Sequence, residues 1–417
     1  MPSTRGGILT ALAVLTLAGA RCSSRHETSR PLGLYVSIGS YDFHENPELL
    51  ERILASPYGY FRFINQRFAQ SLCVRFADDL AAMPKVNLHG DGHVEQYSVT
   101  ESGRGLTDFD DASTGPAILD LVRVGVSIEL VADEKRWSDE KTFLVEEFLR
   151  GYRAALEDPE TIAPQPRVVD RIRAQFGSDR RPLLAWADAL MDPERLPPTP
   201  VQRLIRPFAE AIHEQNPDLP PTYFQVKKAG RHRLGVGSAL DEKYLLRVEG
   251  PTAAAEDDVL VEIKEIRDLS AIECTEREER DALPILAAQS RIAYQPYRFT
   301  GFLHLEPGEA RDRGLGTNFS AGTSFWFHTW VDHYYEISVE DLQSPQELAE
   351  IVFDMGVQLG RGHPKDVTPD DSKLRRAQLE SLNSYEAELK RTIEDLAEET
   401  VAAWERFRAE ASFPARN

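Results

Sequence analysis

Cysteine is rare in this sequence: only Cys22, Cys73 and Cys274 occur among 417 residues. Their spacing fits no zinc-binding pattern, so the cysteines predict no zinc site. Two interpretations stay open for Cys73 and Cys274. They form one disulfide if the protein is exported, or they are separate thiols that pack as small apolar side chains.

Basic residues are outnumbered, with 48 lysines and arginines against 68 aspartates and glutamates, and the formal net charge is −20. Such a field repels the phosphate backbone of nucleic acids and the surface of an anionic membrane, so neither is expected as a partner. A cationic ligand, or a nucleotide carried with magnesium, is compatible with this charge.

Long apolar runs are also lacking, apart from one at the N-terminus. The run from Ile8 to Ala20 is shorter than the roughly 20 apolar residues of a membrane span, and it ends in Ala-Gly-Ala. We therefore expect a signal peptide over residues 1–20, a linker over 21–35, and export to the periplasm or the exterior. A lipid anchor at Cys22 is the alternative interpretation, although the preceding arginine fits it poorly.

Helical and strand-rich segments follow one another along the mature chain. Helical spacing of apolar residues runs through residues 63–83, begins again near Ala117 and returns near Leu348. The stretches "RHRLGVGSALDEKYLLRVEG" and "DVLVEIKEI" are typical of strands, the first around a tight glycine turn. The predicted fold class is α+β, with a helical segment over 36–200, a strand-rich segment over 201–340 and C-terminal helices over 341–417.

Two acidic loops carry the strongest chemical signal. The stretch "NLHGDGHVEQYS" presents Asp91 between glycines, and "GLTDFDD" places Asp108, Asp110 and Asp111 after a short strand. Carboxylates on adjacent loops suit a divalent cation. In phosphoryl transfer, one aspartate takes the proton of the acceptor hydroxyl, while an amide five residues later and a second aspartate hold magnesium. Asp91, Gln96 and Asp108 follow this order, with glutamine where asparagine is usual.

Phosphoryl transfer also needs a glycine-rich cover for the phosphates and a lysine. The stretch "GVGS", residues 235–238, and Lys264 in "VEIKE" supply both. A glutamate from a following helix is expected to pair with Lys264, and the candidates are Glu273, Glu276, Glu278 and Glu279. Each motif alone is weak, since a glycine turn is often only a hairpin and acids often cap helices. Their joint occurrence favours phosphoryl transfer.

These motifs resemble those of the uncharacterised bacterial family called domain of unknown function 2252. Its loops read "GDxHxEN", "NDFDE…GP…WDLKR", "GVGSVGTR" and "QVKEA". The matching stretches here are "GDGHVEQ", "TDFDDASTGPAILDLVR", "GVGSALDE" and "VEIKE". The two acidic loops also resemble "HGDxHxxN" and "IDFxxA" of the aminoglycoside phosphotransferases and the wider kinase-like superfamily.

The second resemblance implies a two-lobed kinase-like fold whose motif order is circularly permuted, with the catalytic loop before the glycine loop. It implies ATP and magnesium as cofactors. Asp91 would be the catalytic base, and Gln96 and Asp108 the magnesium ligands. The phosphates would meet Gly235, Gly237, Ser238 and Lys264, while His89 and Asp120 would support the catalytic loop.

Three functional hypotheses follow. The first is a phosphotransferase that moves phosphate from a magnesium nucleotide to an unknown hydroxyl on a small molecule or protein. The second is a catalytically inactive binding protein on the same scaffold, because Gln96 replaces asparagine and ATP is scarce outside the cytoplasm. The third is a metal-dependent hydrolase built around His89, Asp91 and His93.

Overall fold

The computed structural model describes residues 33–412 except 45, 102, 178, 238–240, 277–296 and 306–322. The expected signal peptide, Cys22, Ser238, Glu278 and Glu279 therefore lie outside the described residues. Helices and antiparallel sheets share the described chain, which is the predicted α+β class. No helix within the described ranges is long and apolar enough to cross a membrane.

Short capped helices open the described chain. Asn46 and Ser56 each accept a hydrogen bond from the first turn of the helix that follows, and proline occupies the next position in both. These helices are α1 (Pro47–Ala55), α2 (Pro57–Phe63) and α3 (Asn65–Arg75). The helical pattern expected to reach residue 83 ends at Arg75 and gives way to turns and a short 3-10 segment, Leu80–Ala82.

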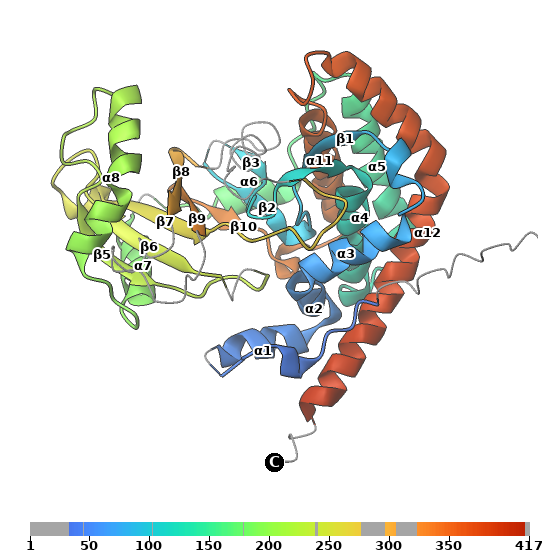
Figure 1. Cartoon of the computed structure of the whole chain (residues 1–417), viewed down its shortest axis with the longest axis horizontal. Helices are drawn as coiled ribbons and strands as arrows, with labels where there is room; N and C mark the ends of the chain where they lie inside the picture. The colour runs from blue at the N-terminus through green and yellow to red at the C-terminus, as the bar shows by residue number, and fades with distance from the viewer. Residues whose placement is uncertain are drawn as a thin grey trace, which may run out of the picture. The chain divides into compact units, whose positions relative to one another are not determined.

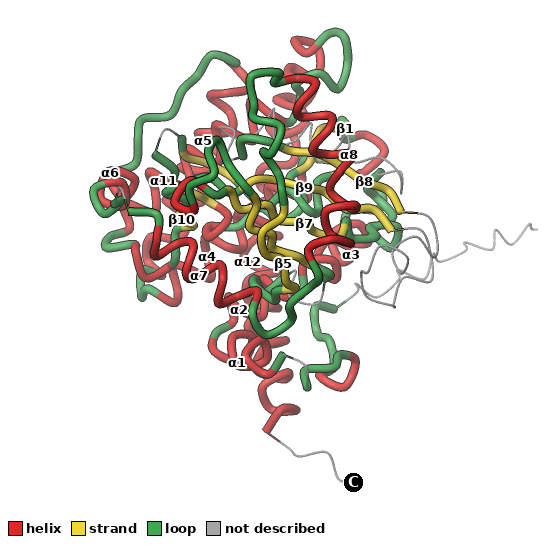
Figure 2. The backbone as a smooth tube through the Cα atoms, turned by 90° about the vertical axis from the view of Figure 1, so that its left-hand side faces the viewer, coloured by secondary structure: helices red, strands yellow, loops and turns green. Residues whose placement is uncertain are grey.

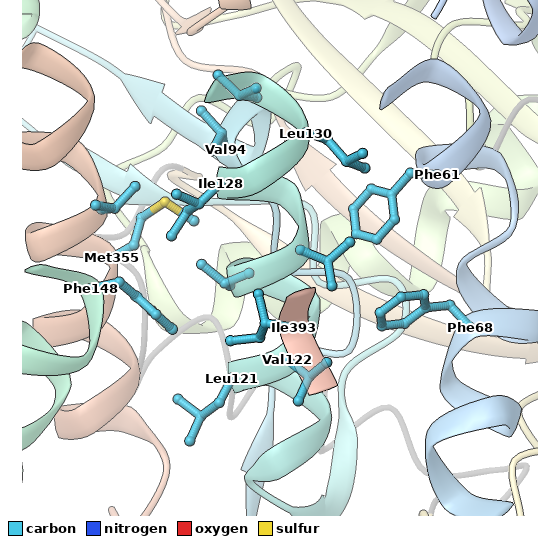
Figure 3. Close-up of a cluster of buried hydrophobic side chains, with 14 of the residues drawn as sticks. Phe61, Phe68, Val94, Leu121, Val122, Ile128, Leu130, Phe148, Met355 and Ile393 are labelled. Atoms are coloured by element: carbon cyan, nitrogen blue, oxygen red, sulfur yellow. The ribbon is translucent and has the colours of Figure 1, made fainter. Parts of the chain in front are cut away.

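The core of the helical part surrounds α4 (Ile118–Glu134), whose residues 118–132 are all buried. A helix with apolar residues around most of its circumference is expected to be packed against neighbours on all sides. Figure 3 shows this cluster, in which Leu121, Val122 and Ile128 of α4 are surrounded by side chains of other helices. The neighbours are α2, α3, α5 (Lys141–Glu157) and α12 (Asp371–Ser412), and Met355 of α11 (Pro345–Gly362) belongs to the same cluster. The expected helix near Ala117 is confirmed.

Helices α5 and α11 approach closely because glycines line their contact. A Cβ atom on Gly356 would lie 2.2 Å from the carbonyl oxygen of Phe148, and one on Gly151 would lie 2.1 Å from that of Phe353. The predicted apolar stripe of α11, from Leu348 to Leu359, is buried against α5. A short helix, α6 (Arg167–Arg173), also packs on α11.

The main sheet has five antiparallel strands in the order β5-β6-β7-β9-β8 (Figure 1). Their bounds are Val226–Arg231, Lys243–Val248, Val259–Glu265, Thr323–Thr329 and Thr300–Leu305. Helix α8 (Pro198–Gln215) packs on the face that carries Leu246 and Ile263, and α7 (Arg181–Met191) packs against Leu245 and Leu260. In Figure 2 the yellow strands lie beside these two red helices. The strand expected from Arg231 begins earlier, at Val226, and residues 232–237 form a loop.

Two small sheets position the acidic loops. Strand β1 (Lys85–Leu88) pairs with β4 (Ser113–Pro116), while β2 (Tyr97–Val99) lies between β3 (Arg104–Leu106) and β10 (Tyr335–Glu336). The loop after β1 leads through the 3-10 turn Val94–Gln96 into β2, and the loop after β3 leads into β4. Because β1 pairs with β4 and β2 with β3, the two acidic loops lie side by side.

Candidate functional site

The loop after β1 is held by the first turn of α4. The Asp120 carboxylate accepts hydrogen bonds from the backbone N–H of His89 at 2.7 Å and of Gly90 at 2.9 Å, and it lies 3.1 Å from Nε2 of His363. Gly90 has a φ of +86°, and a Cβ there would meet the Asp111 carbonyl oxygen at 2.0 Å. Only glycine fits this position. Asp120 thus lies where loop support was expected of it.

Both loop histidines contact protein groups. Nε2 of His89 donates to the Thr107 carbonyl at 2.9 Å, and its Nδ1 accepts the N–H of Asp91 at 3.3 Å. His93 Nδ1 lies 3.1 Å from the Tyr58 hydroxyl. Burial lowers the pKa of both histidines, so both are neutral at pH 7. Across the described part of the chain, no group of three His, Cys, Asp or Glu side chains is arranged to hold a metal ion.

Asp91 is paired with a buried arginine, Arg123, for which the sequence predicted no role. Oδ1 of Asp91 accepts bonds from Nε and Nη2 of Arg123 at 3.1 and 2.7 Å. Arg123 also donates to the Phe61 carbonyl at 3.0 Å and lies 3.6 Å above the Phe61 ring. Burial raises the pKa of Asp91 to about 6 although the Arg123 charge opposes the rise. The available signal was a single basic residue in the largely apolar stretch "ILDLVRVGV".

The second acidic loop meets the sheet through Lys264. Its Nζ lies 2.5 Å from Oδ1 of Asp108 and 2.6 Å from Oδ2 of Asp110. Asp108 has a left-handed backbone, with φ +60°, and Nε2 of Gln96 lies 3.4 Å from its Oδ2. Trp326 Nε1 donates to Oδ1 of Asp110 at 2.7 Å. Gln96, Asp108 and Lys264 are therefore brought together.

The ionisation of the two aspartates differs. Burial and the neighbouring Asp108 charge raise the pKa of Asp110 well above its ordinary value. Burial acts in the same direction on Asp108, but Lys264 outweighs it and lowers the pKa of Asp108 below the ordinary value. Asp108 is thus the carboxylate that stays charged and suits a metal ion.

The prediction that a glutamate from a following helix pairs with Lys264 is wrong for Glu273 and Glu276, the two candidates among the described residues. Glu276 forms a salt bridge with Lys85, and the stretch that contains Glu273 and Glu276 forms turns and a β-bridge rather than a helix. Lys264 instead contacts aspartates of the second acidic loop, and Asp108 lies 156 positions before it in the sequence. Local sequence spacing carries no information about such a distant pair.

The glycine loop between β5 and β6 lies next to the loop after β1 that carries Asp91. Gly235 has a φ of +96°. A Cβ on Gly237 would lie 3.1 Å from the Arg62 carbonyl oxygen and 3.5 Å from Oδ2 of Asp91. Val236 between them is buried in the core of the helical part. The loop thus lies close to Oδ2 of Asp91, the oxygen that Arg123 does not bind.

Further charged residues around the site were not expected from the sequence. Arg267 joins the loops, because it donates to Asp111 at 2.7 Å and to Asp241 at 2.7 and 3.0 Å. Glu262, two residues before Lys264 on the same strand face, accepts from Trp330 Nε1 at 2.8 Å. It also lies within 3.2 Å of His232 and His328. The alternation in "VEIKE" indicated that Glu262 lies on the same face of the strand as Lys264.

A comparison with protein families supports the first of the two resemblances. The model of the family described as "Uncharacterized protein conserved in bacteria (DUF2252)" matches residues 46–185. The match contains both acidic loops and Arg123, whereas the glycine loop and Lys264 lie beyond it. No curated protein and no solved structure gives a significant match. The resemblance to the kinase-like superfamily therefore rests on the sequence motifs alone.

Proposed function

We propose that the protein is a kinase-like phosphotransferase that moves phosphate from a magnesium nucleotide to a hydroxyl acceptor. The observation that supports it is the convergence of four separate segments. Asp91 lies against Gly237, and Asp108 is bound by Lys264, so a base, a metal-binding carboxylate, a glycine loop and a lysine share one site. The two-lobed fold with permuted motif order belongs to the same proposal.

The side chains around Asp108 fit magnesium. This ion prefers hard oxygen ligands and is often bound by one or two protein groups together with phosphate oxygens. Asp108 and Gln96 would offer such a pair if the Gln96 amide turned, because its Nε2 faces Oδ2 of Asp108 at 3.4 Å and only the amide oxygen can bind the ion. When bound, the ion would neutralise phosphate charge that this acidic protein would otherwise repel.

Asp91 has the features of a general base. Arg123 binds its Oδ1, which leaves Oδ2 to accept the proton of the acceptor hydroxyl. With a pKa of about 6, Asp91 is ionised at pH 7 and still basic enough to take that proton. The acceptor oxygen then forms its bond to phosphorus, and the bond from phosphorus to the nucleotide oxygen breaks.

Export is part of the proposal, with a signal peptide over residues 1–20 and lipidation of Cys22 as the alternative. The disulfide between Cys73 of α3 and Cys274 supports it, because disulfides persist in oxidising compartments. Membrane fractionation of cells expressing the full chain and its Cys22→Ala variant separates the two. An anchor predicts that only the unaltered chain stays with the membrane.

The inactive binding protein is the second candidate. It is favoured by Gln96, because the side chain of glutamine is one methylene group longer than that of asparagine and places the amide at a different position. The third hypothesis, a hydrolase around His89 and His93, gains no specific support, since both imidazoles contact protein groups.

A thermal-shift titration with ATP and magnesium tests the proposal. A ligand at 100 times its dissociation constant stabilises the native state by about 2.7 kcal/mol. We expect a magnesium-dependent rise in Tm that is lost in Asp108→Asn and Lys264→Ala. The exposed Asp139→Asn and Lys373→Ala are matched controls and should keep the rise. No rise with any magnesium nucleotide in the unaltered protein would contradict the proposal.

A further inference from the structure

Two buried lysines lie on the sheet face that meets Asp108. Lys243 of β6 and Lys264 of β7 are direct partners in the antiparallel pairing, so their side chains leave one face with Cβ atoms about 5 Å apart. We propose that Lys243, rather than Lys264, binds the terminal phosphates of the nucleotide, while Lys264 holds the acidic loop. This inference rests on the proposed function.

Lys264 is committed to the acidic loop. Its Nζ lies within 2.6 Å of carboxylate oxygens of both Asp108 and Asp110, and all three side chains are largely buried. A magnesium ion would compensate Asp108 if Lys264 turned to a phosphate. It would not replace the contact from Lys264 to Oδ2 of Asp110, whose other oxygen is bound by Trp326. Moving Lys264 would thus break a 2.6 Å contact to a buried carboxyl oxygen, which is unfavourable whether or not that carboxyl group is charged.

Lys243 contacts the glycine loop instead. Its Nζ donates a hydrogen bond to the carbonyl oxygen of Leu234, the residue before Gly235. A phosphate under the glycine loop would therefore meet the Lys243 ammonium first. The charged groups that act on Lys243 include Asp241, two residues before it, Glu262 and Lys264 on β7, and Asp108.

The charge balance around Lys243 favours an anion. Burial and the neighbouring Lys264 charge lower the pKa of Lys243 to about 8. A bound group with several negative oxygens would stabilise the charged forms of both lysines. The ligand class is the terminal phosphate of a nucleoside di- or triphosphate, or of an inorganic oligophosphate.

Binding measurements separate the roles of the two lysines. The dissociation constant of ATP at saturating magnesium and the magnesium concentration at half-maximal binding are measured for Lys243→Met, Lys264→Met and the exposed control Lys373→Met. We expect Lys243→Met to weaken ATP at least tenfold without moving the magnesium midpoint. Lys264→Met should raise the magnesium midpoint and lower the Tm of the ligand-free protein.

A second variant keeps the inference testable if Lys243→Met folds poorly. Lys243→Arg retains the charge at all accessible pH values. Between pH 7 and 9 the unaltered protein should lose ATP affinity about tenfold relative to Lys243→Arg, because only the lysine is neutralised. An ATP affinity of Lys243→Met within threefold of the unaltered protein, or parallel pH profiles, would overturn the role of Lys243 alone. Absence of ATP binding in the unaltered protein would overturn the proposed function as well.

Discussion

At the residue scale, the site is organised by charges that are buried in pairs. Asp91 is bound by Arg123, and Asp108 and Asp110 share Lys264. Taking such groups out of water is costly, and each pair is stable only while both partners are present. The two arrangements also shift the carboxyl pKa in opposite directions, upward at Asp91 and downward at Asp108.

Arg123→Gln should destabilise the protein by about 3–5 kcal/mol at pH 8, because it leaves the Asp91 carboxylate buried without its cation. The folded-state pKa of Asp91, already raised to about 6, should rise further. A raised carboxyl pKa means that the native state binds the extra proton, so stability should recover as the pH falls from 8 to 5. Urea unfolding at both pH values measures this.

The control for Arg123→Gln is the double variant with Asp91→Asn. Without a carboxylate to compensate, the arginine substitution should cost much less, and its cost should no longer depend on pH. An equal loss of stability at pH 5 and pH 8 in the single variant would contradict the buried ion pair.

Asp120→Ala should cost about 3–5 kcal/mol in the free energy of unfolding, because the carboxylate accepts bonds from two backbone N–H groups and neighbours His363. Urea unfolding provides the value. The exposed control Asp139→Ala should stay within about 0.5 kcal/mol of the unaltered protein. A similarly small effect of Asp120→Ala would show that the loop does not depend on this contact.

At the element scale, regular patterns were predictable and contacts between distant loops were not. The alternation in "VEIKE" correctly predicted β7, and the apolar spacing correctly predicted α4 and α11, because local periodicity determines which face is buried. The aspartate partners of Lys264 and the Arg123–Asp91 pair depend on how loops meet in three dimensions. The prediction that the helical pattern reaches residue 83 was wrong, because the last eight residues, "FADDLAAM", form turns and a short 3-10 segment after Arg75.

The glycine loop gives a prediction at this scale. Gly237→Ala would place a Cβ 3.1 Å from the Arg62 carbonyl and 3.5 Å from Oδ2 of Asp91, so we expect the glycine loop to shift away from Arg62 by a few tenths of an ångström. We expect ATP affinity to fall at least fivefold while the ligand-free Tm changes little. Gly177→Ala is the matched control, since no atom lies within 4 Å of its Cβ position. Unchanged affinity in Gly237→Ala would place the phosphates elsewhere.

At the scale of the whole molecule, one covalent bond joins distant parts of the chain. The Cys73–Cys274 disulfide links α3 to the segment that follows β7 across a separation of 201 residues. In the chain-entropy model, a loop of this length stabilises the native state by up to about 5 kcal/mol, since it restricts the unfolded chain.

Reduction of the disulfide should therefore lower the free energy of unfolding by about 2–5 kcal/mol. A chain that begins at Ser23, and so contains only Cys73 and Cys274, should show no reactive thiol when it is unfolded without reductant. It should show two when it is unfolded with reductant. Cys73→Ser/Cys274→Ser is the control, since added reductant should not change its stability. Two reactive thiols in the unfolded, unreduced protein would contradict the bond.

The central claim is that the acidic loops and the sheet form one site of phosphate transfer with Asp91 as its base. The direct test is release of ADP from ATP and magnesium with water as acceptor, followed by phosphorus NMR for the unaltered protein, Asp91→Asn and the control Asp139→Asn. A positioned general base contributes a factor of about 10² to 10⁴, so Asp91→Asn should bind ATP yet release ADP at least a hundredfold more slowly. Equal rates in the unaltered protein and Asp91→Asn, or no ADP from the unaltered protein, would contradict the account.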